Sequence, residues 1–346
     1  MKIVAAMSGG VDSSVAAAVL KEEGHQVIGA TMQVWPPDGP SSAVEDAKKA
    51  AGQLGIPHHV IDLRDVFARR VIAEFCREYS LGRTPNPCII CNRDIKFGVL
   101  LEKARELGAD YISTGHYARI EMDSGNGRYL LKKGADRHKE QSYWLYSLTQ
   151  AQLSHIILPL GKLTKEEVRE IAGKLQLTAL SRPESQDICF IPNNNYPRFL
   201  KERVPEAACP GPVLDREGKV LGEHRGILFY TVGQRRNLGI AAREPQYVIG
   251  INPEKNAIIV GGRQEIYRRE LTASRLNWIA IDKLSQPIAV SARVRHRHRE
   301  VTATVTPVAD ELVHVLFEQP QPAITPGQSA VFYQDDTVIG GGIIDE

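Results

Sequence analysis

The most informative chemical string in the chain is Ser8-Gly9-Gly10-Val11-Asp12-Ser13-Ser14. Apolar residues 2–5 before it predict a buried strand, and Val11, Val15 and Val19 at helical spacing predict a helix after it. Two adjacent glycines in such a turn let several backbone N–H groups point to one place, where the helix also directs its positive end. Serine hydroxyls add donors for phosphate oxygens, and Asp12 is a ligand for Mg²⁺. The string therefore predicts a site for a nucleotide polyphosphate.

A pair of glycines alone would indicate only a tight turn, with Asp12 or Ser13 capping the helix. The whole string, however, resembles the signature of the PP-loop ATP pyrophosphatases, and we favour nucleotide binding. This resemblance implies that ATP is cut between its α and β phosphates and that AMP is left on an activated oxygen. The string lacks the Gly-Lys-Ser/Thr ending of a Walker A loop, so kinase-like γ-phosphate transfer is less favoured. The residues implied in binding ATP are Ala6, Met7, Ser8, Gly9, Gly10, Val11, Asp12 and Ser13, with Mg²⁺ held through ATP at Asp12.

Three cysteines form a second group with chemical potential. Cys88 and Cys91 have Cys-x-x-Cys spacing, and Cys189 lies on a later segment that a compact domain can bring to the same strand ends. Five cysteines in 346 residues are too few for a disulfide scaffold, so the pair indicates metal or redox chemistry. The alternative, a cysteine acting as a small buried apolar residue, fits Cys76 on an apolar helix face, and we extend it to Cys209.

The first 200 residues show strands alternating with helices, the pattern of a parallel sheet covered on both faces. Beyond the first strand and helix we predict strands at 26–31, 59–63 and 111–114, helices at 43–54, 66–79, 94–107 and 165–175, and a hairpin with its tip at 123–127. Ligands bind such sheets at the carboxyl ends of the strands, where Ser8, Met32 and Gly115 would emerge. Pro85 and Pro87 predict a rigid loop around the cysteine pair, without regular helix before about Asn92.

Beyond about residue 200, short alternating apolar runs separated by Gly, Pro and Asn-Pro turns predict small β domains or barrels. The expected fold class is therefore α/β: a parallel-sheet PP-loop domain (1–203), a small β-rich central domain (204–268) and a C-terminal β-barrel (269–346). In the run 292–299, a strand would place four arginines on one face. We favour a phosphate-binding stripe for RNA there over a merely solvated strand.

Composition is that of an ordinary globular protein with two or three domains, at 42% hydrophobic and 24% charged residues. No apolar run approaches the roughly 18 residues that span a membrane, and no signal peptide precedes the first strand, so we expect a cytoplasmic protein without a membrane partner. The net charge of +2 implies no nucleic-acid partner by itself, so the distribution of charge matters more.

Six motifs taken together resemble the tRNA-specific 2-thiouridylases, over the whole length of the chain. Besides the PP-loop they lie at 86–92, 115–119, 139–143, 187–191 and 230–236. The resemblance implies an enzyme that adenylates the C2 oxygen of the wobble uridine in lysine, glutamate and glutamine tRNAs, after which sulfur displaces AMP. An AMP ester makes that oxygen a better leaving group for a sulfur nucleophile. The residues implied in contacting tRNA are Asn86, Pro87, His116, Lys139, Glu140, Gln141, Arg295, His296 and Gln328.

The same resemblance assigns Cys91 as the nucleophile and Cys189 as the carrier of a persulfide, with a disulfide between them after transfer. Where many family members have an acidic residue three positions before the nucleophile, this chain has Cys88. Three cysteines resemble the subgroup thought to hold a [4Fe–4S] cluster with one iron open to hydrosulfide, and we favour it because Cys88 otherwise has no evident purpose. Zinc explains less. A persulfide pair stays open, as does the sulfur donor, a persulfide relay protein or hydrosulfide.

Two other functions compete with this one. An amide-forming PP-loop synthetase would leave the cysteines and the arginine run without a role. An RNA-binding or iron–sulfur carrier protein would retain the nucleotide pocket without turnover, and ATP–pyrophosphate exchange that depends on tRNA would distinguish it from the enzyme.

Overall fold

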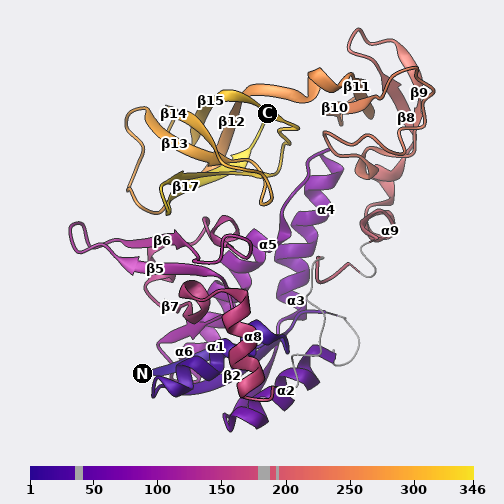
Figure 1. Ribbon diagram of the computed structural model, residues 1–346. Coiled ribbons are helices and arrows are strands. Elements are labelled where there is room, and N and C mark those ends of the chain that lie inside the picture. Colours follow the sequence, from indigo (N-terminus) through magenta and orange to yellow (C-terminus); the bar gives the residue numbers. More distant parts are fainter. Residues whose placement is uncertain (36–41, 178–187, 192–194) are drawn as a thin grey trace.

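The computed structural model describes residues 1–35, 42–177, 188–191 and 195–346 (Figure 1). The N-terminal α/β part occupies the lower half of Figure 1, the barrel near the C-terminus the upper left and a smaller β unit the upper right. Within the described ranges, no helix is both long and apolar enough to cross a membrane.

The N-terminal part is built on a five-stranded sheet in which all neighbouring strands are parallel, in the order β3-β2-β1-β4-β7. The strands are β1 (Lys2–Ala6), β2 (Gln26–Gln33), β3 (His58–Asp62), β4 (Tyr111–Ser113) and β7 (Ile156–Ile157). Side chains of β1 alternate between two cores: Ile3 and Ala5 pack with α1 (Val11–Glu22), α2 (Ser42–Leu54) and α8 (Lys165–Lys174), and Val4 packs on the other face. This confirms the predicted parallel α/β fold.

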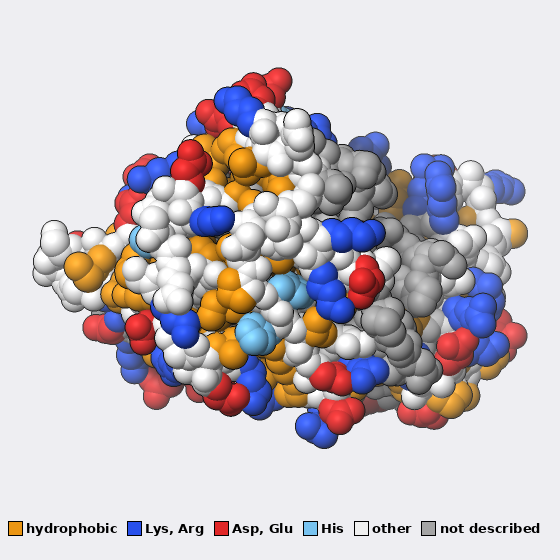
Figure 2. All heavy atoms as spheres, turned by 90° about the horizontal axis from the view of Figure 1, so that it is seen from below, with side chains coloured by type: hydrophobic (Ala, Val, Ile, Leu, Met, Phe, Trp, Pro, Cys, Tyr) orange, Lys and Arg blue, Asp and Glu red, His pale blue; other side chains and the backbone are white. Residues whose placement is uncertain are grey.

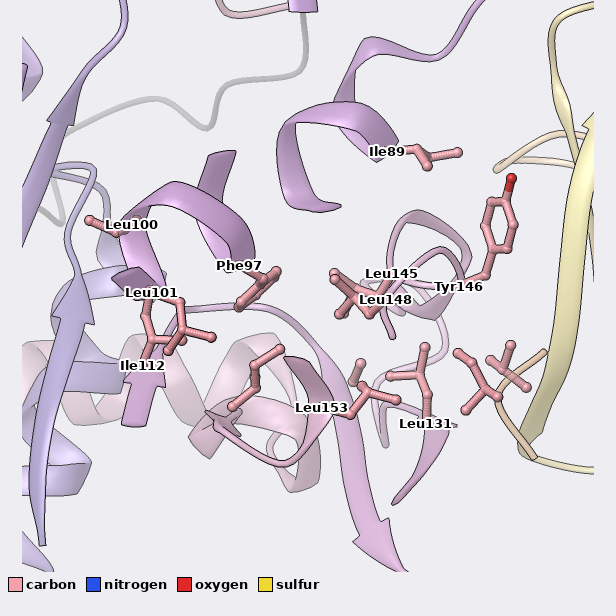
Figure 3. Packing of buried hydrophobic residues seen from close by; sticks show 14 of the residues in the cluster. Ile89, Phe97, Leu100, Leu101, Ile112, Leu131, Leu145, Tyr146, Leu148 and Leu153 are labelled. Atoms are coloured by element: carbon pink, nitrogen blue, oxygen red, sulfur yellow. The ribbon is translucent and has the colours of Figure 1, made fainter. Parts of the chain in front are cut away.

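The second core lies on the opposite face and joins α6 (Leu100–Glu106) to the segment 143–153 (Figure 3). Tyr146 lies at its edge beside a strand of the barrel. A Cβ on Gly341 would come within 2.7 Å of the Tyr146 ring, so only glycine fits this contact. The core of the first domain therefore continues to the barrel.

The cysteine pair lies on a helix, and the predicted rigid loop is wrong. Helix α5 (Pro87–Ile90) continues through the π-helical η2 (Cys91–Val99) into α6. Pro87 occupies the first helical position, where its missing N–H leaves no hydrogen bond unmade, and the Asn86 side chain accepts a hydrogen bond from the Cys88 N–H. The prolines therefore start a helix instead of preventing one. The predicted helix at 66–79 is confirmed as the run α3 (Arg64–Phe67), η1 (Ala68–Ile72) and α4 (Ala73–Ser80).

The β-rich remainder forms two units, as predicted. The smaller has the strand order β10-β11-β8-β9, with β8 (Gly211–Leu214), β9 (Val220–His224), β10 (Tyr247–Asn252) and β11 (Ala257–Gly261). The barrel runs β12-β15-β14-β13-β16-β17 and closes because β17 also pairs with β12. Its strands are β12 (Tyr267–Trp278), β13 (Ile288–Arg293), β14 (Val301–Ala309), β15 (Leu312–Pro322), β16 (Ser329–Gln334) and β17 (Thr337–Ile344).

A hairpin from the first half of the chain joins the barrel. Strands β5 (Ala118–Met122) and β6 (Tyr129–Lys133) form the predicted hairpin, and Lys132 of β6 pairs with Thr337 of β17. The hairpin was predicted, but its place in the barrel's sheet was not, since strand pairing over such a distance in sequence leaves no local pattern.

Candidate active site

The PP-loop is held in shape by its own side chains. Gly9 has φ +76°, a conformation that favours glycine. The Ser13 hydroxyl accepts from the Ser8 N–H at 3.1 Å and donates to the Gly10 carbonyl at 3.1 Å. Gly115, from the turn after β4, packs against the start of α1, where a Cβ would lie 2.8 Å from the Ser13 nitrogen. The loop and the Gly115 turn therefore lie together at the carboxyl end of the sheet.

The remaining residues predicted for ATP lie around this loop. Met7 is buried, and its carbonyl accepts a hydrogen bond from the Thr31 hydroxyl at 2.8 Å. Met32, at the end of β2, is half-buried between two of the hydrophobic cores. Ala6 ends β1, and Val11 begins α1.

Asp12 is held from two sides by residues that the sequence analysis did not single out. Its Oδ1 accepts a hydrogen bond from the Tyr117 hydroxyl at 2.8 Å and one from Lys165 Nζ at 2.7 Å. Lys165 is only 8% exposed and opens α8, whose predicted capping box between Thr164 and Glu167 is present. Inside such a box a lysine resembles any lysine on a helix surface, so the sequence held no signal for its position. An ammonium and a carboxylate thus lie together at the PP-loop, and their charges suit phosphate oxygens and Mg²⁺ respectively.

The three cysteine thiols share one electrostatic environment. Burial raises the pKa of Cys91 to about 12, with smaller contributions from Cys189 and Cys88. Desolvation of the sulfur, with a smaller contribution from the charge of Cys88, raises the pKa of Cys189 to about 11. Desolvation also raises the pKa of Cys88. Both residues nevertheless have side-chain surface exposed to solvent. The Lys96 ammonium lowers all three pKa values. The structure thus brings the predicted cysteines close enough to influence one another.

In the part of the chain that the structure describes, no group of three or more His, Cys, Asp or Glu side chains is arranged around a metal position. Three thiolates are the donors that an iron–sulfur cluster requires, but they would have to converge on it. The described geometry does not show this convergence. Of the other cysteines, Cys76 is buried as predicted, whereas Cys209 is exposed, so extending the apolar explanation to Cys209 was wrong.

His116 joins the turn beside the PP-loop to η2, the helix that begins at Cys91, because its ring centroid lies 5.9 Å from that of Phe97. It follows Gly115, is 8% exposed, and its Nδ1 lies 2.6 Å from the Thr114 hydroxyl. Burial, with a smaller effect of Lys96, holds the pKa of His116 well below its ordinary value, so the ring is neutral at pH 7. Lys96 therefore acts on both this turn and the cysteines.

Several predicted tRNA contacts lie where the catalytic domain meets the barrel. The His296 ring stacks on Trp144, with centroids 3.9 Å apart, and the Glu140 carboxylate accepts from Arg293 at 3.0 Å. The Gln328 amide donates to the carbonyl of Thr84, two residues before Asn86. Gln141 accepts from the backbone of Tyr117. Lys139 is half-buried at the same segment.

The predicted single-faced arginine strand is wrong. Strand β13 ends at Arg293, and residues 294–300 turn away. Arg293 is paired with Glu140 and Glu300, and Arg295 donates to the Val232 carbonyl and the Thr325 hydroxyl. These inward contacts outweigh the alternation of a strand. Only Arg297 and Arg299 are exposed.

Charge is not gathered by sign on the face shown in Figure 2, where blue and red side chains are interspersed. This agrees with 43 basic against 41 acidic residues. On this face, therefore, no large basic patch would bind nucleic acid by charge alone.

Comparison with known families supports the same class of protein. A model described as "tRNA methyl transferase HUP domain" matches residues 1–193. One described as "tRNA methyl transferase PRC-barrel domain" matches 197–262, and an "Aminomethyltransferase beta-barrel domain" matches 268–344. The fold and the loop thus define a three-domain, ATP-using tRNA-modifying protein of the PP-loop class.

Relatives with a stated activity identify the family. The tRNA-specific 2-thiouridylase MnmA of Halothermothrix orenii is 51% identical over 355 residues, covering 100% of this chain and 99% of that protein. That of Heliobacterium modesticaldum is 53% identical over 353 residues, covering 99% and 92%. The chain belongs to the tRNA-specific 2-thiouridylase family. Among solved structures, the chain is similar to the U34-tRNA thiolase NcsA of Methanococcus maripaludis with its [4Fe-4S] cluster, with a TM-score of 0.35 and 19% sequence identity. The match covers 60% of this chain and 65% of that one, and it is too distant to support an inference.

We predict that Asp12→Asn and Lys165→Met each weaken Mg·ATP binding by at least about tenfold, because each removes one charge-assisted contact. Isothermal titration with a non-hydrolysable ATP analogue measures this, and thermal melting monitors the fold. Tyr117→Phe is the matched control, since it removes a contact to Asp12 but no charge. Unchanged affinity in both charge variants would contradict the assignment of the site.

We also predict that Cys91 alkylation by iodoacetamide rises with pH beyond pH 10, because only the thiolate reacts and its pKa is raised to about 12. Lys96→Met should slow the reaction further at each pH, since Lys96 lowers that pKa. Peptide mass spectrometry measures the rates, with the exposed Cys209 as internal reference. A plateau of the Cys91 rate near pH 9 would contradict the pKa shift.

Proposed function

We propose that this site performs the ATP-dependent 2-thiolation of the wobble uridine in lysine, glutamate and glutamine tRNAs. The observation that carries the proposal is that the turn after β4 packs on the nucleotide loop and, through the His116 and Phe97 rings, on η2, the helix that begins at Cys91. Gly115 packs on the PP-loop, His116 follows it, and Lys96 acts on both His116 and the three cysteines. A base positioned between loop and thiols would meet ATP on one side and sulfur on the other.

In the first step the uridine C2 oxygen forms a bond to the α-phosphorus of ATP, and the bond to pyrophosphate breaks with its electron pair. The PP-loop N–H groups and the Lys165 ammonium stabilise the phosphate charge that develops. Asp12 holds Mg²⁺ against the phosphates in this proposal. Because Asp12 and Lys165 are already in contact, their charges are positioned before ATP arrives.

In the second step the terminal sulfur of a Cys189 persulfide bonds to C2. The Cys91 thiolate attacks the inner sulfur, the S–S bond breaks, and AMP leaves from C2. The product is 2-thiouridine with a Cys91–Cys189 disulfide, which an external thiol must reduce before the next turnover. The persulfide comes from a relay protein or from hydrosulfide delivered with an oxidant.

A second version assigns Cys88, Cys91 and Cys189 to a [4Fe–4S] cluster. The donor set and the mutual influence of the three thiols support it. The lack of a converging arrangement among the described residues counts against it, and we adopt the persulfide pair.

The tRNA is proposed to lie along the junction of the catalytic domain and the barrel. Asn86, Pro87, His116 and residues 139–141 come from the first of the proposed domains (1–203), and His296 and Gln328 from the last (269–346). Arg295, also from the last domain, supports this surface through its inward hydrogen bonds. The stacking of His296 on Trp144 and the bond from Gln328 to Thr84 support a shared surface. A cytoplasmic location, where tRNA is present, belongs to the same proposal.

We predict that Cys88→Ala protein, purified without oxygen, retains tRNA thiolation within a few-fold, since the persulfide pair does not require this thiol. Cys91→Ala and Cys189→Ala should abolish thiolation while tRNA-dependent ATP–pyrophosphate exchange continues. Product mass spectrometry, pyrophosphate exchange and an iron and sulfide assay measure these outcomes.

Cys88→Asp restores the commoner family motif and serves as the conservative control. Joint loss of iron and thiolation in both Cys88 variants, with exchange intact, would overturn the persulfide version in favour of the cluster. No tRNA-dependent exchange in the wild type would contradict the enzyme itself.

We predict that Arg297→Ala/Arg299→Ala weakens tRNA binding and lowers the slope of log affinity against log salt by roughly 0.7–0.9 for each lost phosphate contact. Arg295→Ala should instead lower the melting temperature, because its guanidinium bonds inward to Val232 and Thr325. Filter binding across salt concentrations measures the slope. The exposed Arg105→Ala on α6 is the control, and an unchanged slope in the double variant would exclude a phosphate role.

A further inference from the structure

A cavity of about 680 Å³ lies between the catalytic domain and the barrel, apart from the PP-loop. Its walls come from η1 and α4, from α5 and η2, and from β12. This volume is within the range of pockets that hold small ligands, roughly 300–1,000 Å³. None of the residues that line it belongs to the ATP site described above.

The lining is positively charged. Five arginines and three carboxylates line the cavity. The carboxylates are already neutralised: Glu74 and Glu78 are paired with Arg77 and Arg275, and Asp94 is paired with a third arginine, Arg93. The remaining two arginines are Arg69 and Arg70. The excess charge is therefore cationic and suits an anion.

Arg69 and Arg70 carry this excess. Both are exposed, both line the cavity, and neither makes a hydrogen bond or ion pair within the described ranges of the chain. Adjacent guanidinium groups repel each other in the absence of an anion, and guanidinium is the side chain best shaped to hold phosphate oxygens.

A buried hydroxyl points to the same conclusion. Ser147 lines the cavity and is 6% exposed, and its Oγ has no hydrogen-bond partner among the described residues. An unsatisfied buried polar atom is costly and needs an explanation. Beside it Tyr146, whose hydroxyl pairs with Ser329 at 3.0 Å, and Ile89 supply apolar surface (Figure 3). The lining thus combines cations, a hydroxyl and apolar walls.

We propose that this cavity binds a phosphate group through Arg69 and Arg70. The phosphate has two possible sources. One is a free nucleotide or pyrophosphate, and the other is the backbone of bound tRNA. Only the tRNA source rests on the proposed function. Ile89 and Ile90 line the cavity and lie between Cys88 and Cys91 on one helical turn. A bound phosphate therefore contacts the helix that carries the thiols from a side other than the PP-loop.

The test compares wild type with Arg69→Ala/Arg70→Ala. With the PP-loop filled by a non-hydrolysable ATP analogue, isothermal titration with pyrophosphate and with AMP measures the free source. Binding that weakens roughly tenfold or more in the double variant supports it. If neither ligand binds the wild type, tRNA binding is compared across salt concentrations. A slope of log affinity against log salt that is roughly 1.4–1.8 units smaller in Arg69→Ala/Arg70→Ala than in wild type, as expected for two lost phosphate contacts, supports the backbone source.

Two further variants keep the outcome interpretable. Arg268→Ala/Arg269→Ala removes an adjacent exposed arginine pair on β12 that does not line the cavity, and it should leave pyrophosphate and AMP binding unchanged. Ala73→Trp fills the cavity from the exposed face of α4 without removing charge and should reproduce the loss. Equal free-ligand binding and equal tRNA salt slopes in wild type and Arg69→Ala/Arg70→Ala would overturn the proposal. Thiolation by the wild type, assayed separately, shows whether the proposed function itself holds.

Discussion

The contact between the Asp12 carboxylate and the Lys165 ammonium is the interaction on which the catalytic arrangement depends. It joins the start of α1 to the start of α8, residues 153 positions apart, and the Tyr117 hydroxyl adds the turn after β4. Lys165 is only 8% exposed, and the carboxylate at the loop lies 2.7 Å from its Nζ. The pair therefore ties three segments to the carboxyl edge of the sheet and places both charges where a nucleotide would bind.

A second constraint is the union of the catalytic domain with the barrel. Arg293 bonds to Glu140 of the first domain and to Glu300 of the barrel, and Lys133 on the β5–β6 hairpin also reaches Glu300. Lys133 and Arg293 both lie over the Tyr333 ring, where cations are attracted to the π face. Segments that bind RNA in the proposal are thereby held in one unit, which a flexible tether could not achieve.

The helical setting of the cysteines changes what they can do. A loop would let the thiols reorient, whereas a helix begun by Asn86 and Pro87 holds Cys88 and Cys91 within one helical turn, with Lys96 following. Desolvation disfavours the thiolates, and Lys96 partly offsets it. At pH 7 the Cys91 thiol is therefore neutral in the free protein.

Local features determined what the sequence alone could show. The PP-loop string, the strands at its side, the capping box at Thr164 and the closed β-rich second half depend on periodicity and turn chemistry between near neighbours, and these predictions are confirmed. The resemblance to a family supplied the expected chemistry. Where two local signals competed, as with prolines that either break or begin a helix, the prediction for residues 85–92 was wrong.

Tertiary structure alone decided the contacts between distant residues. Lys165 reaches Asp12 because α8 packs beside α1, and nothing in its neighbourhood in the sequence distinguishes it from a solvated lysine. Arg293 and Arg295 turned inward because acceptors on other elements offered hydrogen bonds worth more than exposure on a strand, so the alternation of types in 292–299 predicted the wrong geometry. The physical reason is common to both cases: a side chain's partners depend on which elements pack together, and that information is spread over the whole chain.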